Sequence, residues 1–190
     1  MWSEEKIIKY IKANLKKTRF EHCIGVKDTA VKLAKQNGVD VQKALIAALV
    51  HDCAKYLSDG KLIEYSKKYG FKLDEVTLKN PSLLHGVAGA YIAKTEMKIE
   101  DNEILNAIIY HTTGRKNMSL LEKIIYIADY IEPSRNFPGV DILRKKTFSN
   151  LDEGLLLGLD NTINYIIKRG QLLHIDTVNA RNDLILKANI

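Results

Sequence analysis

The sequence has little cysteine and little proline, and it lacks any long uninterrupted apolar run. Its 190 residues include two cysteines, Cys23 and Cys53, too few for a disulfide framework. No charged and then apolar leader opens the sequence, so we expect a cytoplasmic protein with reduced thiols. Apolar stretches such as Ala44 to Val50 fall far short of the roughly 20 residues that a membrane-spanning helix needs. We therefore predict neither a disulfide-stapled domain nor a membrane partner.

Basic residues outnumber acidic ones, with 29 Lys and Arg against 23 Asp and Glu, for a formal charge of +6. The lysines are scattered, without an Arg-rich or Gly-rich segment and without the interleaved aromatics that stack bases. We therefore predict no nucleic-acid partner. A small anionic substrate fits the basic balance equally well, because a cleft rich in Lys and Arg attracts phosphate.

Apolar residues recur at helical spacing along nearly the whole chain, and no alternating strand pattern competes with them. After a first helix that carries Ile7 and Leu15, we expect helices at about 21–37, 41–51, 59–69, 73–79, 101–110, 119–131, 140–149 and 151–169, a helix of small residues after a breaker at 80–82, and a last helix from about Thr177. Length and composition suit one core. The predicted fold is all-α, a single-domain helical bundle over residues 1–190.

The expected helix at 41–51 is apolar on every face from Ala44 to Val50, so we predict that it lies at the centre of the bundle. His51 and Asp52 end this helix. Ionisable groups are rarely buried without a partner or a metal, so this pair indicates a site. The two oxygens of Asp52 suit one metal, or two metals that it bridges.

Further ionisable residues border core segments elsewhere in the chain. Asp129 lies inside the apolar run 124–131 and needs a positive partner, while His22, His85 and His111 flank apolar or small-residue helices. Taken alone, each histidine is more often a satisfied core or capping residue than a ligand. Together with His51 and Asp52, they supply the imidazoles and carboxylates that transition metals prefer.

These residues follow one another in an order that, with their neighbours, carries a resemblance. The motifs are Arg19-x-x-His22, His51-Asp52-x-x-Lys55, Leu84-His85-Gly86, His111-Thr112-Thr113-Gly114, Ala128-Asp129-Tyr130-Ile131-Glu132-Pro133-x-Arg135 and His174-x-x-Thr177-Val178-x-Ala180-Arg181-Asn182. The set resembles the HD-domain phosphohydrolases, and within them the YqeK family of symmetrical bis(5'-nucleosyl)-tetraphosphatases, which cleave diadenosine tetraphosphate to two ADP. The likeness covers about residues 4 to 185. Ile175 stands where the family has proline.

The resemblance implies a metal centre and a nucleotide site. It implies that iron, as one or two ions, is held by His22, His51, Asp52 and Asp129, with manganese, cobalt or zinc as substitutes. His85 and His111 would serve a second metal or the phosphates, or one of them would act as the acid for the leaving phosphate. It also implies nucleotide contacts from Tyr130, His174, Thr177 and Arg181, with the C-terminal segment 171–190 folding over the active site.

A bound divalent metal makes hydroxide available as a nucleophile, so no serine or cysteine nucleophile is required. Lys55, Arg19 and Arg135 are the candidate fixed cations for the phosphates, although each alone could equally form a surface ion pair. The expected catalytic residues are His51, Asp52, Lys55, His85 and His111. The expected substrate-binding residues are Arg19, Asp52, Lys55, His85, His111, Asp129, Tyr130, Arg135, His174, Thr177 and Arg181.

Other functions remain open from the sequence. The same machinery could act on a deoxynucleotide, a cyclic nucleotide or guanosine tetraphosphate, because fold and metal site do not set the substrate. A non-catalytic nucleotide sensor and a metal-free helical adaptor are alternatives from other classes. A homodimer is a further expectation for a helical protein of this size.

Overall fold

The computed structural model describes residues 1–187, which form helices and loops without a strand. The helices are α1 (Glu4–Asn14), α2 (Lys17–Gln36), α3 (Val41–Val50), α4 (Asp59–Tyr69), α5 (Glu75–Lys79), the 3-10 turn η1 (Pro81–Leu84), α6 (His85–Thr95), α7 (Asn102–Tyr110), α8 (Leu120–Ile131), α9 (Val140–Ser149), α10 (Leu151–Lys168) and α11 (Ile175–Lys187). The predicted all-α fold is confirmed. None of the helices over these residues has the length and hydrophobicity to cross a membrane.

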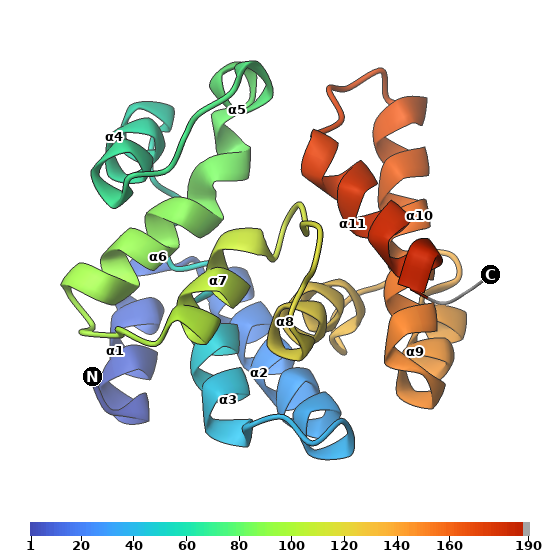
Figure 1. The fold of residues 1–190 in the computed structure, drawn as a ribbon. Helices are drawn as coiled ribbons and strands as arrows, with labels where there is room; N and C mark the ends of the chain where they lie inside the picture. Colours follow the sequence, from blue (N-terminus) through green and yellow to red (C-terminus); the bar gives the residue numbers. More distant parts are fainter. Residues whose placement is uncertain (188–190) are drawn as a thin grey trace.

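The helices form two halves that meet at α8 (Figure 1). Helices α1 to α7 make up the larger half, in which α3 contacts α1, α2, α7 and α8. Helices α9 to α11 make up the smaller half, in which α10 contacts both of its neighbours as well as α8. In α3, every side chain from Ile46 to Val50 is buried, so the predicted central position of this helix is confirmed.

Two helices begin earlier than the sequence indicated. Helix α2 begins at Lys17, not near Glu21, and its N-cap residue Lys16 makes no side-chain capping bond. Because the start carries no Ser, Thr, Asp or Asn cap, the sequence held no signal for it, and the expectation that His22 begins the helix is wrong. Helix α11 begins at Ile175, before the expected Thr177.

Helices α6 and α7 approach closely at a glycine of α6. A Cβ atom on Gly86 would lie 2.6 Å from the carbonyl oxygen of Ile109 and 2.7 Å from that of Ile108. Only glycine allows this approach without displacing the backbone of α7. The close contact brings His85, the first residue of α6, beside His111, which follows the last residue of α7.

Candidate metal centre

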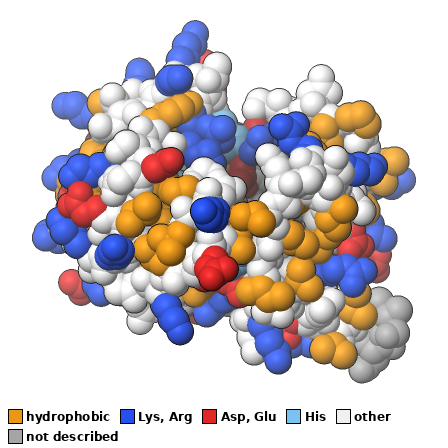
Figure 2. Space-filling view, turned by 90° about the horizontal axis from the view of Figure 1, so that it is seen from above, with side chains coloured by type: hydrophobic (Ala, Val, Ile, Leu, Met, Phe, Trp, Pro, Cys, Tyr) orange, Lys and Arg blue, Asp and Glu red, His pale blue; other side chains and the backbone are white. Residues whose placement is uncertain are grey.

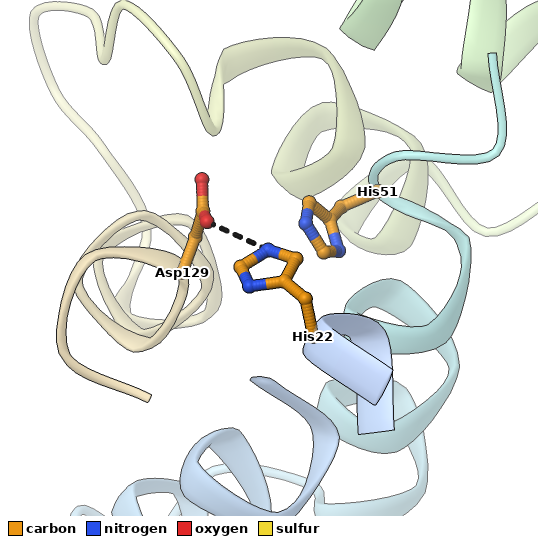
Figure 3. A group of neighbouring side chains, drawn as sticks. All are labelled: His22, His51 and Asp129. Atoms are coloured by element: carbon orange, nitrogen blue, oxygen red, sulfur yellow. Dashed lines mark ion pairs between the residues drawn. The ribbon is translucent and has the colours of Figure 1, made fainter. Parts of the chain in front are cut away.

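Three side chains from separate parts of the chain point toward one another in the core (Figure 3). His22 comes from α2, His51 from the turn after α3, and Asp129 from α8. The Nε2 atom of His22 lies 3.0 Å from Oδ1 of Asp129. The candidate ligand atoms of the three residues all lie within 4.8 Å of one another, a spacing that a single ion can bridge.

Asp52 joins this group to a second pair of histidines. Its Oδ2 atom lies 3.5 Å from Nε2 of His51 and 3.9 Å from Nε2 of His22. Its Oδ1 atom lies 3.0 Å from Nε2 of His85 and 3.7 Å from Nε2 of His111. The carboxylate therefore faces two pairs of imidazoles, the arrangement expected of a bridging ligand. We call His22, His51, Asp52, His85, His111 and Asp129 the His–Asp site.

Each histidine of this site holds its Nδ1 atom in a hydrogen bond that turns Nε2 toward the centre. His51, His85 and His111 each donate Nδ1–H to the carbonyl oxygen three residues earlier, at 2.6 to 2.7 Å. His22 instead donates Nδ1–H to Oε1 of Glu132, at 2.9 Å. With the ring proton on Nδ1, a neutral imidazole keeps a lone pair on Nε2 for a metal.

The Nε2 atoms of His85 and His111 lie only 2.9 Å apart. Two lone pairs at this distance repel unless a cation or a donor lies between them. The Lys55 ammonium lies 3.1 Å from Nε2 of His85 and 3.6 Å from Oδ1 of Asp52, and the Thr112 hydroxyl lies 3.2 to 3.3 Å from both rings. This side of the site therefore suits a second cation or a ligand that donates hydrogen bonds.

The polar atoms of the His–Asp site fit a metal ion. Over residues 1–187, Nε2 of His22, Nε2 of His51 and Oδ1 of Asp52 are buried without a hydrogen-bond partner. Such atoms are costly in a core unless something binds them. Imidazole and carboxylate donors are those that divalent transition metals prefer, so these residues form a divalent-metal site.

Two arginines neutralise the carboxylates of the site. Arg19 donates to Oδ2 of Asp52 at 2.8 Å, and Arg135 donates to Oδ1 and to the backbone oxygen of Asp129 at 2.5 and 2.8 Å. Burial alone would raise the pKa of Asp52, but the imidazoles of His51, His111 and His85 hold that pKa well below its usual range. Burial likewise opposes ionisation of Asp129, whose pKa is lowered by the adjacent His22 ring and by the charge of Arg135. Both carboxylates are therefore anionic ligands.

Burial favours the neutral form of the His111 ring. Burial, the largest cause, lowers the pKa of its ring to about 4, although the neighbouring Asp52 carboxylate opposes the shift. A group with this pKa carries no dissociable imidazolium proton near neutrality. The geometry therefore favours a ligand or acceptor role for His111 over the role of an acid.

Two adjoining cavities lie near the His–Asp site, the first of them lined by His22, and Lys, Arg and His side chains gather around the hollow between the two halves (Figure 2). The first, of about 350 Å³, is lined by Thr18, Arg19, His22, Tyr56, Glu132, Ser134, Arg135, Asn136 and Phe137. The second, of about 560 Å³, is lined by Tyr130, Arg135, Phe137, Pro138, Asn161, Thr162 and Tyr165. Arg135 and Phe137 line both, and the Tyr130 and Phe137 rings stack with centroids 5.1 Å apart.

The tail residues make structural contacts. His174 accepts from the backbone N–H of Asp176 at the start of α11 and donates Nε2–H to Oδ2 of Asp74, at 2.9 Å. Thr177 is buried, and Arg181 donates to Oδ1 of Asp160 at 2.6 Å. Over residues 1–187, no hydrogen bond or ion pair joins these three tail residues to the His–Asp site.

Helix α11 does cover the loop that follows His111. A Cβ atom on Gly114 would lie 3.0 Å from Cβ of Ala180 in this helix. The closure of segment 171–190 over the active site stays a prediction, and its last residues, 188–190, lie outside the described part of the chain.

Some residues of the site escaped the sequence analysis. Glu132 lies within a sequence motif that assigned it no role. Glu132 lies three residues after Asp129, which on a helix places both on neighbouring positions of one face, so spacing could have identified it. Tyr56 and Phe137 line the cavities through tertiary contacts, for which the sequence offered no signal.

Comparisons with known proteins agree with this geometry. A family model for the HD domain matches residues 19–134. The symmetrical bis(5'-nucleosyl)-tetraphosphatase of Halalkalibacterium halodurans is 41% identical over 96% of this chain and 97% of its own length. The protein of the same name from Bacillus subtilis is 40% identical over 96% of this chain and 98% of its own.

A solved structure extends the likeness to three dimensions. A crystal structure from Clostridium acetobutylicum, described as a predicted HD superfamily hydrolase involved in NAD metabolism, matches with a TM-score of 0.96 and 52% identity. The match covers 98% of this chain and 99% of that one. By the matched model, by its full-length relatives and by the metal site built from its own residues, this chain belongs to the HD-domain family.

Proposed function

We propose that this chain hydrolyses diadenosine tetraphosphate, and related dinucleoside polyphosphates, symmetrically to two ADP. The observation that carries the proposal is a divalent-metal site whose ligand His22 lines a cavity, beside a second cavity that shares Arg135 and Phe137 with the first. A substrate with a nucleoside at each end needs room on both sides of its central phosphoanhydride. The relatives that match over their full length carry the name of this activity.

The metal ligands of the proposed enzyme are His22, His51, Asp52 and Asp129, and the metal is iron, bound as one or two ions. Manganese, cobalt or zinc would satisfy the same donors. The metal supplies an activated water and polarises a phosphoryl oxygen when it is bound. The fixed Nδ1 hydrogen bonds of the ligand histidines orient their rings in advance, which lowers the cost of assembling the site.

The basic side chains bind and orient the phosphates. Lys55 presents its ammonium beside His85 at the open edge of the site, and Arg135 reaches both cavities. Arg19 and Arg135 pair with Asp52 and Asp129, so an anionic phosphate competes with these carboxylates for the two guanidinium groups. His85 and His111 then face the phosphates or a second metal.

The ends of the substrate occupy the two cavities. The Tyr130 and Phe137 pair offers an aromatic surface for one nucleoside, and Tyr56 lines the first cavity, which the other nucleoside would occupy. We include His174, Thr177 and Arg181 as nucleotide contacts in a closed state in which the segment 171–190 covers the site. The two free, buried thiols suit a reducing cytoplasm, and we keep a homodimer as part of the proposal.

Product analysis tests the activity. The purified protein is incubated with diadenosine tetraphosphate and ferrous iron under reducing conditions, with and without chelator, and the nucleotides are separated by anion exchange. We expect ADP as the only product. The Asp52→Asn variant should lose activity by at least about 100-fold, because removing a metal ligand lowers activity more than removing a group that only orients a ligand. Asp152→Asn, at an exposed pair with Lys123, is the matched control and should keep full activity.

The products also separate the alternatives. Release of ATP and AMP would contradict symmetrical cleavage. Hydrolysis of NAD, guanosine tetraphosphate, a deoxynucleotide or a cyclic nucleotide, with diadenosine tetraphosphate left intact, would keep the metal site and reject the substrate. Tight nucleotide binding without any hydrolysis would favour a sensor.

A further inference from the structure

His22 differs from the other histidines of the site in how its Nδ1 atom is held. His51 and His111 directly follow helices, and His85 follows the 3-10 turn η1, so the Nδ1–H of each reaches a carbonyl oxygen of the last turn before it; for His85 this is the oxygen of Ser82, which also accepts from the backbone N–H of His85. His22 lies inside α2, more than one turn after Lys17, where the helix uses its own carbonyl groups. Its Nδ1–H therefore needs an acceptor from another element.

Glu132 is that acceptor. It is the C-cap residue of α8, its side chain is 1% exposed, and its Oε1 atom accepts from Nδ1 of His22 at 2.9 Å. Both carboxylate oxygens are engaged, because the Ser134 hydroxyl donates to Oε1 and the Ser134 backbone N–H donates to Oε2 at 2.7 Å. The carboxylate is thus held on the outer side of His22, away from the metal-facing Nε2.

Helix α2 has a gap in its surface where this carboxylate enters. A Cβ atom on Gly25, one turn after His22, would lie 2.5 Å from Oε2 of Glu132. Any larger residue at this position would displace the carboxylate. The sequence therefore provides an acceptor on α8 and the space for it on α2.

We propose that Glu132 is a positioning residue for the metal centre, and the proposal rests on the metal binding included in the proposed function. Its carboxylate keeps the ring proton of His22 on Nδ1 and fixes the ring plane, so that Nε2 presents its lone pair to the ion. Asp129, 3.0 Å from Nε2, would otherwise attract the ring proton to the metal side. A carboxylate partner also raises the basicity of a ligand imidazole, and losing such a partner costs about 10- to 100-fold in metal affinity.

Glu122 provides a matched control on the same helix. Its side chain is 2% exposed, and its two oxygens accept from Arg115 at 2.7 and 2.8 Å. Removing Glu122 therefore breaks an equally buried carboxylate pair of α8 without touching a ligand of the metal. A general loss of stability would appear in both variants, whereas loss of positioning belongs to Glu132 alone.

The test measures zinc affinity by chelator competition in the wild type, Glu132→Ala, Glu132→Gln, Gly25→Ala and Glu122→Ala. We expect affinities about 10- to 100-fold weaker for Glu132→Ala and Gly25→Ala, a smaller loss for Glu132→Gln, which keeps an acceptor oxygen, and no loss for Glu122→Ala. Unfolding curves identify variants that do not fold, and Glu132→Gln and Gly25→Ala then decide the question.

Nuclear magnetic resonance of zinc-loaded protein with ¹⁵N-histidine gives a second readout. The chain has five histidines, so the His22 signal can be assigned as the one missing from His22→Asn. We expect its Nδ1–H to be slow to exchange in the wild type and in Glu122→Ala, and to exchange rapidly in Glu132→Ala. Wild-type affinity in both Glu132 variants, or equal losses in Glu132→Ala and Glu122→Ala, would overturn the inference. A wild type that takes up no zinc would instead overturn the metal site itself.

Discussion

Lys55 lies where a fixed positive charge would act on the phosphates without holding the metal. Its ammonium lies 3.1 Å from Nε2 of His85 and 3.6 Å from Oδ1 of Asp52, and a third of the side chain is exposed. A preorganised donor of this kind contributes more in the transition state than in the bound substrate. From the sequence alone, Lys55 could either bind the phosphates or form a surface ion pair.

We therefore expect Lys55→Ala to lower kcat by about 100-fold. Metal affinity should change little, because Lys55 supplies no ligand atom. Steady-state kinetics and metal titration of the same preparation measure the two effects. Lys61→Ala, which removes an exposed partner of Glu64, is the control and should match the wild type. An unchanged kcat in Lys55→Ala would assign Lys55 to a surface ion pair.

At the scale of the elements, α11 is attached to the rest of the protein by a buried carboxylate. Oδ2 of Asp183 accepts from the backbone N–H of Asn117 at 3.0 Å and from Lys187 at 2.7 Å. Burial opposes the charge, but these two hydrogen bonds lower the pKa of Asp183. The bond to Asn117 ties α11 to the loop between α7 and α8, and so fixes the helix that covers this loop.

The lowered pKa of Asp183 determines how the stability of the protein changes with pH. Asp183 contributes to stability above the ordinary carboxyl pKa, and the contribution is lost as the pH falls through its lower pKa in the folded protein. We expect Asp183→Ala to lower the free energy of unfolding by about 1–2 kcal/mol at pH 7. Urea unfolding at decreasing pH should show this difference shrinking under acid conditions.

Asp28→Ala serves as the control for this measurement, because its exposed side chain forms only a surface pair with Lys27. It should change stability by less than about 0.5 kcal/mol at every pH. A difference between Asp183→Ala and the wild type that stays constant with pH would show that the charge of Asp183 does not contribute.

At the scale of the whole molecule, the His–Asp site connects elements that are distant in the sequence. His22 lies on α2, His51 and Asp52 follow α3, and Asp129 lies on α8. An ion that binds all of them binds only the folded chain. Metal binding is therefore expected to stabilise the entire protein by mass action.

Addition of a divalent metal at 100 times its Kd should stabilise the fold by about 2.7 kcal/mol, a rise in Tm of roughly 5–10 °C for a chain of this size. Thermal unfolding with manganese, cobalt or zinc, before and after chelator, measures the shift. Asp52→Ala, which removes the carboxylate facing all four imidazoles, should show little or none of it. If the Tm of this variant rose by the same amount, the metal would have to bind outside the His–Asp site.

The sequence by itself determined the helical fold, because apolar residues at helical spacing require one buried face on nearly every helix. It determined the candidate ligands as well. Carboxylates such as Asp52 and Asp129 lie in segments so apolar that a charged group there needs a partner. The start of α2 was not determined, since Lys16 offers no cap.

Only the tertiary structure decided how these residues meet. The two faces of the Asp52 carboxylate, the 2.9 Å approach of His85 to His111 and the bond from His22 to Glu132 all join elements that are remote in the sequence. The pairing of Arg181 with Asp160 and of His174 with Asp74 arises in the same way. Periodicity sets which face of a helix is buried, but the direction of each side chain within the core depends on how the helices pack against one another.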